Sequence, residues 1–321
     1  MKTTILTAAM LGALASPAVA ATLNGSMGYG LAGGGNQLVI FDKLSDSTSA
    51  TTLSLTGGTL DAIAYRPVTG ELYGYSIGAG KASDAVYVID TMTGALTNTG
   101  ATFGAGAKIG SNARMGFDFN NAIDAARAVS TQDDNLVFFP DTFPSTNAGT
   151  VQRFTNLAYA AGDVNEGVNA DIFANAYTNA IDGQTATTTL QYALDAKTNS
   201  LVTLANNAGT LATIGKVTYN GAELDFNARG GFDIVSLSEG DNLAIALLNV
   251  PGGPAMGTSG LYTIDLTTGA ASFFGDPGQS SFIGFAAATN LSAVPLPASS
   301  LLLVGGLGAL GAVARRRRRK A

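Results

Sequence analysis

Short runs of β-branched and aromatic residues recur along the chain, and each run closes on an aspartate. Five of them end at Asp42, Asp90, Asp141, Asp195 and Asp265, at spacings of 48, 51, 54 and 70 residues. Turn residues follow, as in DTMTG from Asp90 and DLTTG from Asp265. A glycine or asparagine at the end of such a turn suits the positive φ of a type I turn with a bulge. Each run therefore predicts one strand of a hairpin.

Between these runs lies a second kind of segment, which predicts a strand, a turn and another strand. Examples are LDAIAYRPVTGELYGYS from Leu60, MGFDFNNAIDAARAVS from Met115 and GFDIVSLSEGDNLAIALL from Gly231. A less regular version, residues 157–179, precedes the run that ends at Asp195. Two hairpins in about 50 residues form one four-stranded sheet, and serial sheets of that size are typical of a β-propeller.

The two ends of this region each supply one unpaired strand. SMGYGLAG begins at Ser26, and IGFAAATN begins at Ile283. Pairing of the strands near Tyr29 and Phe285 would build a blade from both termini and remove the exposed sheet edges. We expect an all-β propeller of four-stranded blades, with five blades, or six if the long gap before Asp265 hides another. Sandwiches also contain many short strands and are the alternative.

Composition supports an all-β fold and excludes several chemistries. The chain has 41 glycines and no cysteine, histidine or tryptophan, a composition suited to many tight turns. A Ser-His-Asp triad, a cysteine nucleophile and a zinc site of His and Cys are therefore impossible. Paired carboxylates for glycoside cleavage stay open. A G-x-G-x-x-G pattern at Gly28, Gly30 and Gly33 precedes a predicted strand instead of a helix, so we assign it to strand and turn.

The N-terminus has the features of a signal peptide. Lys2 supplies the positive region, an apolar stretch follows to Ala15, and Pro17 breaks it. Ala18 and Ala20 then form the small-x-small pattern that signal peptidase recognises. We predict residues 1–20 to be a signal peptide that is cut after Ala20.

The C-terminus combines an apolar run with a basic cluster. Residues 298–314 are apolar, and residues 315–320 are six consecutive basic residues. A helix over the apolar run would be about 26 Å long, near the lower limit for a membrane span. Removing both ends leaves ten basic and 23 acidic residues, a net charge of −13. The remaining chain is strongly acidic, which disfavours nucleic acid and anionic membranes as partners.

This tail resembles the VPLPA variant of the PEP-CTERM bacterial sorting signals. The motif is Val294, Pro295, Leu296, Pro297 and Ala298, followed by the apolar helix and the arginine cluster. The resemblance implies an exosortase-type membrane protease as a partner, transient anchoring by the C-terminus, and then transfer to the surface of a Gram-negative, exopolysaccharide-producing bacterium or release from it. The chain then divides into a signal peptide (1–20), a repeat domain (21–293) and a sorting signal (294–321).

The body resembles a bacterial family of propeller-like repeat proteins catalogued as a domain of unknown function. The matching stretches include AYRPVTGELYGYS, VYVIDTMTGALTNTG and GFDFNNAIDAARAVS, and they cover most of Leu60 to Leu204 in the family's order. Asn121-Ala122 departs from the commoner Asn-Pro at that turn. The resemblance implies the fold and no particular activity.

One loop, GDVNEGVNAD, is a candidate calcium site. Its oxygen-bearing side chains are Asp163, Asn165, Glu166, Asn169 and Asp171. Calcium prefers several such oxygens, some of them charged. The loop is too short for an EF-hand and lacks its closing glutamate, so a solvated turn is the other interpretation. We assign the calcium hypothesis to Asp163, Asn165, Asn169 and Asp171, and expect no other cofactor.

These observations predict an exported, surface-sorted, noncatalytic propeller that binds or organises the extracellular matrix. Its partner would be a matrix polysaccharide or protein. The alternative is a secreted hydrolase or lyase that acts on extracellular polysaccharide. Carboxylates that converge on the central channel would favour the alternative, whereas a channel lined by Thr, Asn and backbone would favour binding.

Overall fold

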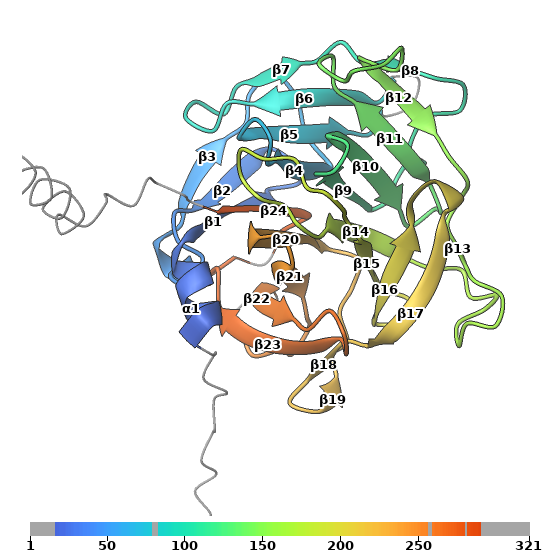
Figure 1. Ribbon diagram of the computed structural model, residues 1–321. Coiled ribbons are helices and arrows are strands. Elements are labelled where there is room, and N and C mark those ends of the chain that lie inside the picture. The colour runs from blue at the N-terminus through green and yellow to red at the C-terminus, as the bar shows by residue number, and fades with distance from the viewer. Residues whose placement is uncertain (1–16, 79–82, 256–258, 280, 290–321) are drawn as a thin grey trace, which may run out of the picture. The chain divides into compact units, whose positions relative to one another are not determined.

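Five small sheets stand around one axis in the computed structural model, which describes residues 17–78, 83–255, 259–279 and 281–289 (Figure 1). The fold is all-β, as the sequence predicts, and each sheet is one blade of a β-propeller. A helix, α1 (Pro17–Asn24), precedes the first strand, and two short 3₁₀ turns, η1 (Ser47–Ser49) and η2 (Asn206–Ala208), lie between strands.

Each blade has four main strands, which follow one another from the axis outward. Blade 1 contains β24 (Gly284–Thr289), β1 (Ser26–Ala32), β2 (Gln37–Phe41) and β3 (Thr51–Ser54). Blade 2 contains β4 (Ala62–Arg66), β5 (Glu71–Ser76), β6 (Ala85–Ile89) and β7 (Leu96–Asn98). Blade 3 contains β9 (Met115–Asn120), β10 (Ala125–Ser130), β11 (Asn135–Phe139) and β12 (Thr150–Arg153). Blade 4 contains β14 (Ile172–Tyr177), β15 (Gln191–Asp195), β16 (Ser200–Ala205) and β17 (Thr210–Lys216). Blade 5 contains β20 (Gly230–Ser238), β21 (Asp241–Asn249), β22 (Ser259–Ile264) and β23 (Ala270–Gly275).

Short strands extend three of the blades at their outer edges. β8 (Thr102–Phe103) pairs with β12, and β13 (Ala158–Tyr159) pairs with β17, both in parallel. β18 (Thr218–Tyr219) pairs in parallel with β23 and forms a small hairpin with β19 (Ala222–Glu223). Each short strand comes from the chain that enters its blade, so it covers an edge that would otherwise be open.

The inner strands close the ring at five blades. β24 packs against β4, β4 against β9, β9 against β14, β14 against β20, and β20 against β24. The long gap before Asp265 contains β16 to β21, which complete blade 4 and begin blade 5. A sixth blade at that place is therefore wrong for the residues that the structure describes.

Both termini contribute to blade 1, as the sequence predicts. β1 pairs antiparallel with β24, with Tyr29 opposite Ala286 and Gly30 opposite Phe285. The same strand β1 pairs with β2 on its other side. The innermost strand of this blade thus comes from the end of the domain, and the other three come from its beginning. The ring closes by strand pairing between the two ends of the chain.

One of the five runs that end on aspartate does not occupy the same position in its blade as the other four. The runs that end at Asp42, Asp90, Asp141 and Asp265 belong to the third strands β2, β6, β11 and β22, but the run that ends at Asp195 is the second strand, β15. The cause is the long connection between β14 and β15, residues 178–190, which we name the strap. The strap delays the second strand of blade 4, so that β15 lies at the sequence spacing expected for a third strand. The third strand of this blade is β16.

Burial explains why the strands show continuous apolar runs instead of strict alternation. All residues of β9, β10, β11 and β14 are buried, because each blade is covered on both faces by its neighbours. Aromatic rings fill the space between blades 2 and 3, where Tyr75 contacts Phe117 at 5.7 Å between ring centroids and Tyr73 contacts Phe119 at 5.2 Å. Burial on both faces demands apolar side chains on both faces.

The axis is packed almost solid where the inner strands begin. A cavity of only about 10 Å³ remains there, lined by residues from the start of all five inner strands. Glycines allow this approach: a Cβ on Gly231 would lie 2.4 Å from the backbone nitrogen of Phe285, and one on Gly116 would lie 2.7 Å from the Cα of Ala174. The backbones of neighbouring blades therefore touch directly.

Two buried aspartates join neighbouring inner strands farther along the axis. Asp118 on β9 accepts a hydrogen bond at 2.8 Å from the backbone N–H of Tyr177 on β14. Asp233 on β20 accepts one at 2.6 Å from the N–H of Ala287 on β24. Inner strands have an unpaired edge toward the axis, and a buried amide without an acceptor is costly. The two carboxylates supply that acceptor from the adjacent blade.

The strap closes the end of the axis at which the inner strands finish. Figure 1 shows it in yellow-green, extending from β14 across the ring and returning to β15. Asn179 is bound on two sides: its N–H donates to Asn242 Oδ1 of blade 5 at 2.7 Å, and its carbonyl accepts from Asn121 Nδ2 of blade 3 at 2.8 Å. The side chain of Ile181 is buried.

The tip of the strap reaches the other two blades. The N–H of Gly183 donates to the carbonyl of Pro67, beyond β4, at 2.8 Å. The hydroxyl of Thr289, the last residue of β24, donates to Asp182 Oδ2 at 2.7 Å. A loop of blade 4 is therefore hydrogen-bonded to blades 1, 2, 3 and 5 and acts as a second closure of the ring.

Three acidic groups, one in the strap and two on the inner strands, have raised pKa values. Burial raises the pKa of Asp182 to about 6, although hydrogen bonds from Thr289 and Tyr65 oppose the rise. Burial also raises the pKa of Asp233, and the nearby charge of Asp182 adds to the effect. For Asp118, burial comes first and the charge of Asp233 second in raising the pKa. The native ring therefore binds protons that the unfolded chain releases near pH 4.

We predict that Gly231→Ala destabilises the propeller strongly. The added Cβ would overlap backbone atoms of β24, which cannot move without opening the junction of blades 5 and 1. We expect a loss of about 2–3 kcal/mol in the free energy of unfolding, measured by urea denaturation. Gly58→Ala is the matched control, since its nearest neighbour would be 3.6 Å away. Equal effects in the two variants would contradict the packed axis.

We predict that stability falls as the pH rises from 5 to 8. Asp182 has a raised folded pKa of about 6, so its contribution is full below about pH 4 and is lost as the pH passes its folded value. The whole shift corresponds to roughly 3 kcal/mol between pH 4 and pH 8. About half of it falls above pH 5, and solvent screening reduces that part to about 1 kcal/mol. Melting curves of the wild type and Asp182→Asn at both pH values check this, and the variant should lose less.

The control for this measurement is Asp90→Asn in the exposed turn of blade 2. Hydrogen bonds from the Thr93 side chain and from the backbone of Met92 and Thr93 lower the pKa of Asp90, so it stays ionised throughout this range. The control should keep the wild-type dependence on pH. A wild-type protein that is equally stable at pH 5 and pH 8 would contradict the buried acid cluster.

Candidate functional site

The candidate calcium loop binds its own chain through its acidic side chains. Asp163 Oδ1 accepts from the N–H of Asn165 at 2.8 Å and from the hydroxyl of Thr213 at 2.7 Å. Asp163 Oδ2 accepts from the N–H of Thr213 at 2.7 Å, and Asn165 Nδ2 donates to the Thr213 hydroxyl at 2.9 Å. These bonds fasten the start of the loop to β17.

The remaining oxygen-bearing residues of that loop, Glu166, Asn169 and Asp171, share no hydrogen bond with Asp163 among the described contacts. Glu166 Oε2 accepts from the N–H of Gly162 at 2.8 Å, and the N–H of Asp171 donates to Asp195 Oδ1 at 2.8 Å. Asn169 is exposed. Over the described part of the chain, no group of three or more Asp, Glu, His or Cys side chains could hold a metal ion. Calcium at Asp163, Asn165, Asn169 and Asp171 stays a prediction.

The predicted processing sites lie at or beyond the limits of the described chain. Ala18 and Ala20 are exposed residues of α1, and the same helix buries Leu23 against blade 1. The sorting motif Val294–Ala298 and the basic cluster lie outside the described residues. None of the helices in the described ranges is long and apolar enough to cross a membrane.

The axial acids do not form a site that a substrate can reach. Asp118 and Asp233 are only 5% and 4% exposed, and each binds a backbone amide of the next blade. The cavity on the axis is smaller than a sugar ring, at about 10 Å³. Carboxylates do converge on the axis, but they hold the ring together, and the strap covers the end at which they lie.

The open face of the propeller lies at the opposite end of the axis, where the inner strands begin. The residue immediately before each inner strand surrounds this end, which we call the mouth. In ring order from β24 these residues are Ile283, Asp61, Arg114, Asp171 and Arg229. Two acidic and two basic residues alternate there, beside one buried isoleucine.

A pocket of about 510 Å³ opens at the mouth between blades 2 and 3, and we call it the mouth pocket. Its lining is Asp61, Ile77, Gly78, Ser111, Asn112, Ala113 and Arg114. The connection from β8 to β9 supplies four of these residues, and Asn112 adopts a φ of 65° in its turn. The volume lies within the range of small-molecule sites.

Two opposite charges, Asp61 and Arg114, line the mouth pocket. Asp61 Oδ2 accepts from the N–H of Ile77 at 2.7 Å, which fixes the carboxylate at the start of β4. Burial raises the pKa of Asp61, while the hydrogen bond from Ile77 and the charge of Arg114 lower it. Arg114 is partly buried, and its guanidinium forms no hydrogen bond or ion pair with any described residue.

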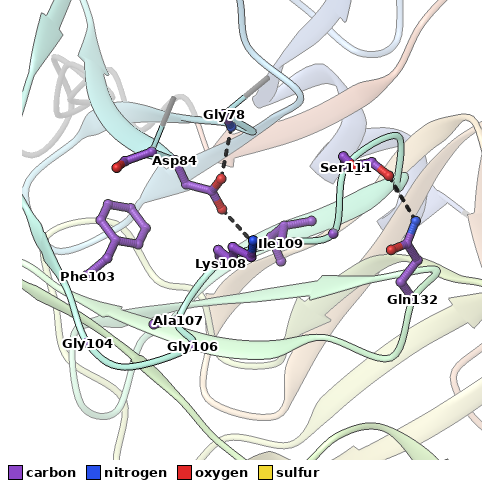
Figure 2. Close-up of a pocket in the computed structure, with 12 residues that line it drawn as sticks. Gly78, Asp84, Phe103, Gly104, Gly106, Ala107, Lys108, Ile109, Ser111 and Gln132 are labelled. Carbon is purple, nitrogen blue, oxygen red and sulfur yellow. Dashed lines mark hydrogen bonds between the residues drawn. The ribbon is translucent and has the colours of Figure 1, made fainter. Parts of the chain in front are cut away.

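A second hollow of about 680 Å³ adjoins the mouth pocket and shares Gly78 and Ser111 with it. Figure 2 shows how Asp84 organises its wall: the carboxylate accepts from the N–H of Gly78 at 2.9 Å and of Ile109 at 2.7 Å. The exposed Lys108 lies on the same rim. Four glycines, Gly78, Gly104, Gly106 and Gly110, form part of the wall and expose backbone, and Phe103 and Gln132 contribute side chains.

Sequence reasoning missed both the axial acids and the mouth. The recurrence of Gly-Phe-Asp at Gly116 and Gly231 was a usable signal for the acids, because glycine marks the close approach and aspartate follows two residues later. Arg114 carries no such signal. Its importance depends on the position before an inner strand and on the absence of an acceptor among the described residues.

Comparison with solved structures finds matches of low similarity. An auxiliary nutrient-binding protein from Bacteroides thetaiotaomicron VPI-5482 is 16% identical over 68% of this chain and 55% of its own, with a TM-score of 0.38. A protein of unknown function from Bacteroides caccae is 10% identical, and the match covers 82% of this chain and 98% of that protein's chain, with a TM-score of 0.38. A chain of the nidogen/laminin complex is 12% identical, and the match covers 83% of this chain and 99% of that chain, with a TM-score of 0.42. The chain thus spans about half the length of the first of these proteins.

Comparison of the sequence with protein families gives one clear result. No curated protein matches the chain. The family described as a domain of unknown function, DUF4394, matches residues 37–286, which include strands of all five blades. The resemblance seen in the repeats is therefore confirmed, and this chain belongs to the DUF4394 family.

Proposed function

We propose that the protein is an exported, noncatalytic propeller that binds matrix polysaccharide at its mouth. The observation that carries the proposal is the mouth pocket, which is open and holds a guanidinium without a partner among the described residues. Asp61, Ser111 and Asn112 surround it with oxygen and amide groups. Such a mixture of fixed polar groups suits the hydroxyls of a sugar, and a matrix protein is the other partner class.

Export and surface sorting complete the proposal. Support comes from the sequence at the two ends of the chain: the signal peptide of residues 1–20 and the sorting signal of residues 294–321. An exosortase-type protease would then act on the tail and place the propeller at the cell surface or in the extracellular space. Removal of the basic tail leaves an acidic body, which suits a soluble binding domain and disfavours nucleic acid.

The absence of a reachable acid pair among the described residues of the axis and the mouth pocket supports binding over catalysis. Glycoside hydrolysis needs two carboxyl groups on opposite sides of the scissile bond. Asp118 and Asp233 are buried and engaged with backbone amides. In the mouth pocket Asp61 is the one acid in the described lining, and Arg114 stands beside it. A charge pair of this kind orients a ligand without supplying an acid and a base.

We predict that the mature protein binds purified exopolysaccharide of its own bacterium and leaves it intact. Biolayer interferometry with immobilised polysaccharide, before and after proteinase treatment of the surface, measures binding and shows that sugar is the target. A reducing-end assay on the same sample should stay at background. Release of reducing ends would favour the secreted hydrolase, and saturable binding that proteinase abolishes would favour a matrix protein. Failure to bind either surface would contradict the proposal.

A further inference from the structure

We propose that the mouth pocket recognises a carboxylate-bearing sugar unit, with Arg114 on the carboxylate and Asp61 on a hydroxyl of the same unit. This inference rests on the proposed binding of polysaccharide and names the class of sugar that the pocket would take. Three features point to a sugar acid: the hydrogen-bond partners of the arginines, the polar atoms of the pocket that have no partner among the described residues, and the negative charge of the surrounding protein.

The arginines of the described chain fall into two groups. Arg66, Arg127 and Arg153 bind protein acceptors: Arg66 pairs with Asp124, Arg127 donates to Asn135 and Tyr177, and Arg153 pairs with Asp134 at 2.7 Å. Their planar donor groups are satisfied within the fold. The other two, Arg114 and Arg229, have no side-chain acceptor in the described structure, and both stand immediately before an inner strand at the mouth.

Only Arg114 of these two lines the mouth pocket. It is partly buried beside Asp61, whereas Arg229 lies outside the lining. A guanidinium presents parallel N–H groups that match both oxygens of a carboxylate, and partial burial strengthens such a pair. A carboxylate is therefore the ligand group that Arg114 fits best.

The remaining free atoms of the pocket suit hydroxyl groups. Asp61 uses Oδ2 for the N–H of Ile77, and its Oδ1 has no hydrogen-bond donor among the described residues. The hydroxyl of Ser111 and the side-chain amide of Asn112 likewise bind no described residue, and both residues are exposed. A sugar acid presents a carboxylate and neighbouring hydroxyls on one rigid ring, and the pocket of about 510 Å³ has room for such a unit.

The charge of the body limits how such a polymer binds. A domain with a net charge of −13 repels a long polyanion overall. Attraction is then confined to isolated cations without an acceptor among the described residues, of which Arg114 is the one that lines the mouth pocket. This favours recognition of one or two units over a long tract. Lys108 adds a positive charge to the lining of the adjoining hollow.

The test compares acidic oligosaccharides with their carboxyl-reduced counterparts. Alginate and polygalacturonate oligomers serve as probes, and reduction converts each carboxylate to a primary alcohol without changing the ring or the linkage. Isothermal titration with the mature protein should show at least about tenfold tighter binding of an acidic oligomer than of its reduced form, as a charge-assisted pair predicts. Arg114→Gln should lose that preference while keeping the affinity for the reduced oligomer.

Arg229→Gln is the matched control, because it removes an equally unpaired arginine from the same position of another blade. It should keep the wild-type preference. Melting curves of both variants should stay close to the wild type, since neither guanidinium forms a hydrogen bond or ion pair with the described protein. Arg114→Gln removes only the charge that lowers the pKa of Asp61. Equal binding of acidic and reduced oligomers, or an equal loss in both variants, would overturn the inference and leave polysaccharide binding standing. Absence of binding to every oligomer and to the exopolysaccharide would overturn both proposals.

Discussion

Direct backbone contact among five inner strands is the constraint on which the rest of this propeller depends. Gly116 and Gly231 let neighbouring strands approach so closely that a Cβ would overlap backbone atoms. The contact leaves about 10 Å³ on the axis, so no ligand passes through the ring. It also leaves inner-edge amides that need acceptors, and Asp118 and Asp233 supply two of them from the adjacent blades. The carboxylates on the axis are thus part of the fold.

A packed axis excludes the central channel as a place for a ligand. The strap ties Asn179 and Asp182 to the other blades at the end where the inner strands finish. At the opposite end, the chain before β4 and the connection from β8 to β9 border the pocket beside Arg114. Rigid inner strands hold the residues that precede them in fixed places, as pre-organised binding requires. The mouth is therefore an end of the axis at which this fold presents fixed polar groups.

The repeat pattern predicts most of the fold, since each blade needs the same hairpins and the same turns. The pairing of the strands near Tyr29 and Phe285 follows from counting the strands at each end, and the structure confirms it. The run that ends at Asp195 misleads because the strap lengthens one hairpin, and sequence spacing cannot distinguish a long loop from a missing strand. The site is harder to predict: whether Arg114 is free depends on where every acceptor lies in three dimensions.

Strand pairing between the chain ends and the packed axis make one closed, cooperative ring. Native-state hydrogen exchange tests this closure most directly. If the ring is closed in this way, the amides of β1 and β24, including Ala287, exchange as slowly as those of β9 and β14, including Tyr177, at rates set by global unfolding. Much faster exchange confined to β1 and β24 would show that blade 1 opens independently and would contradict the closed ring.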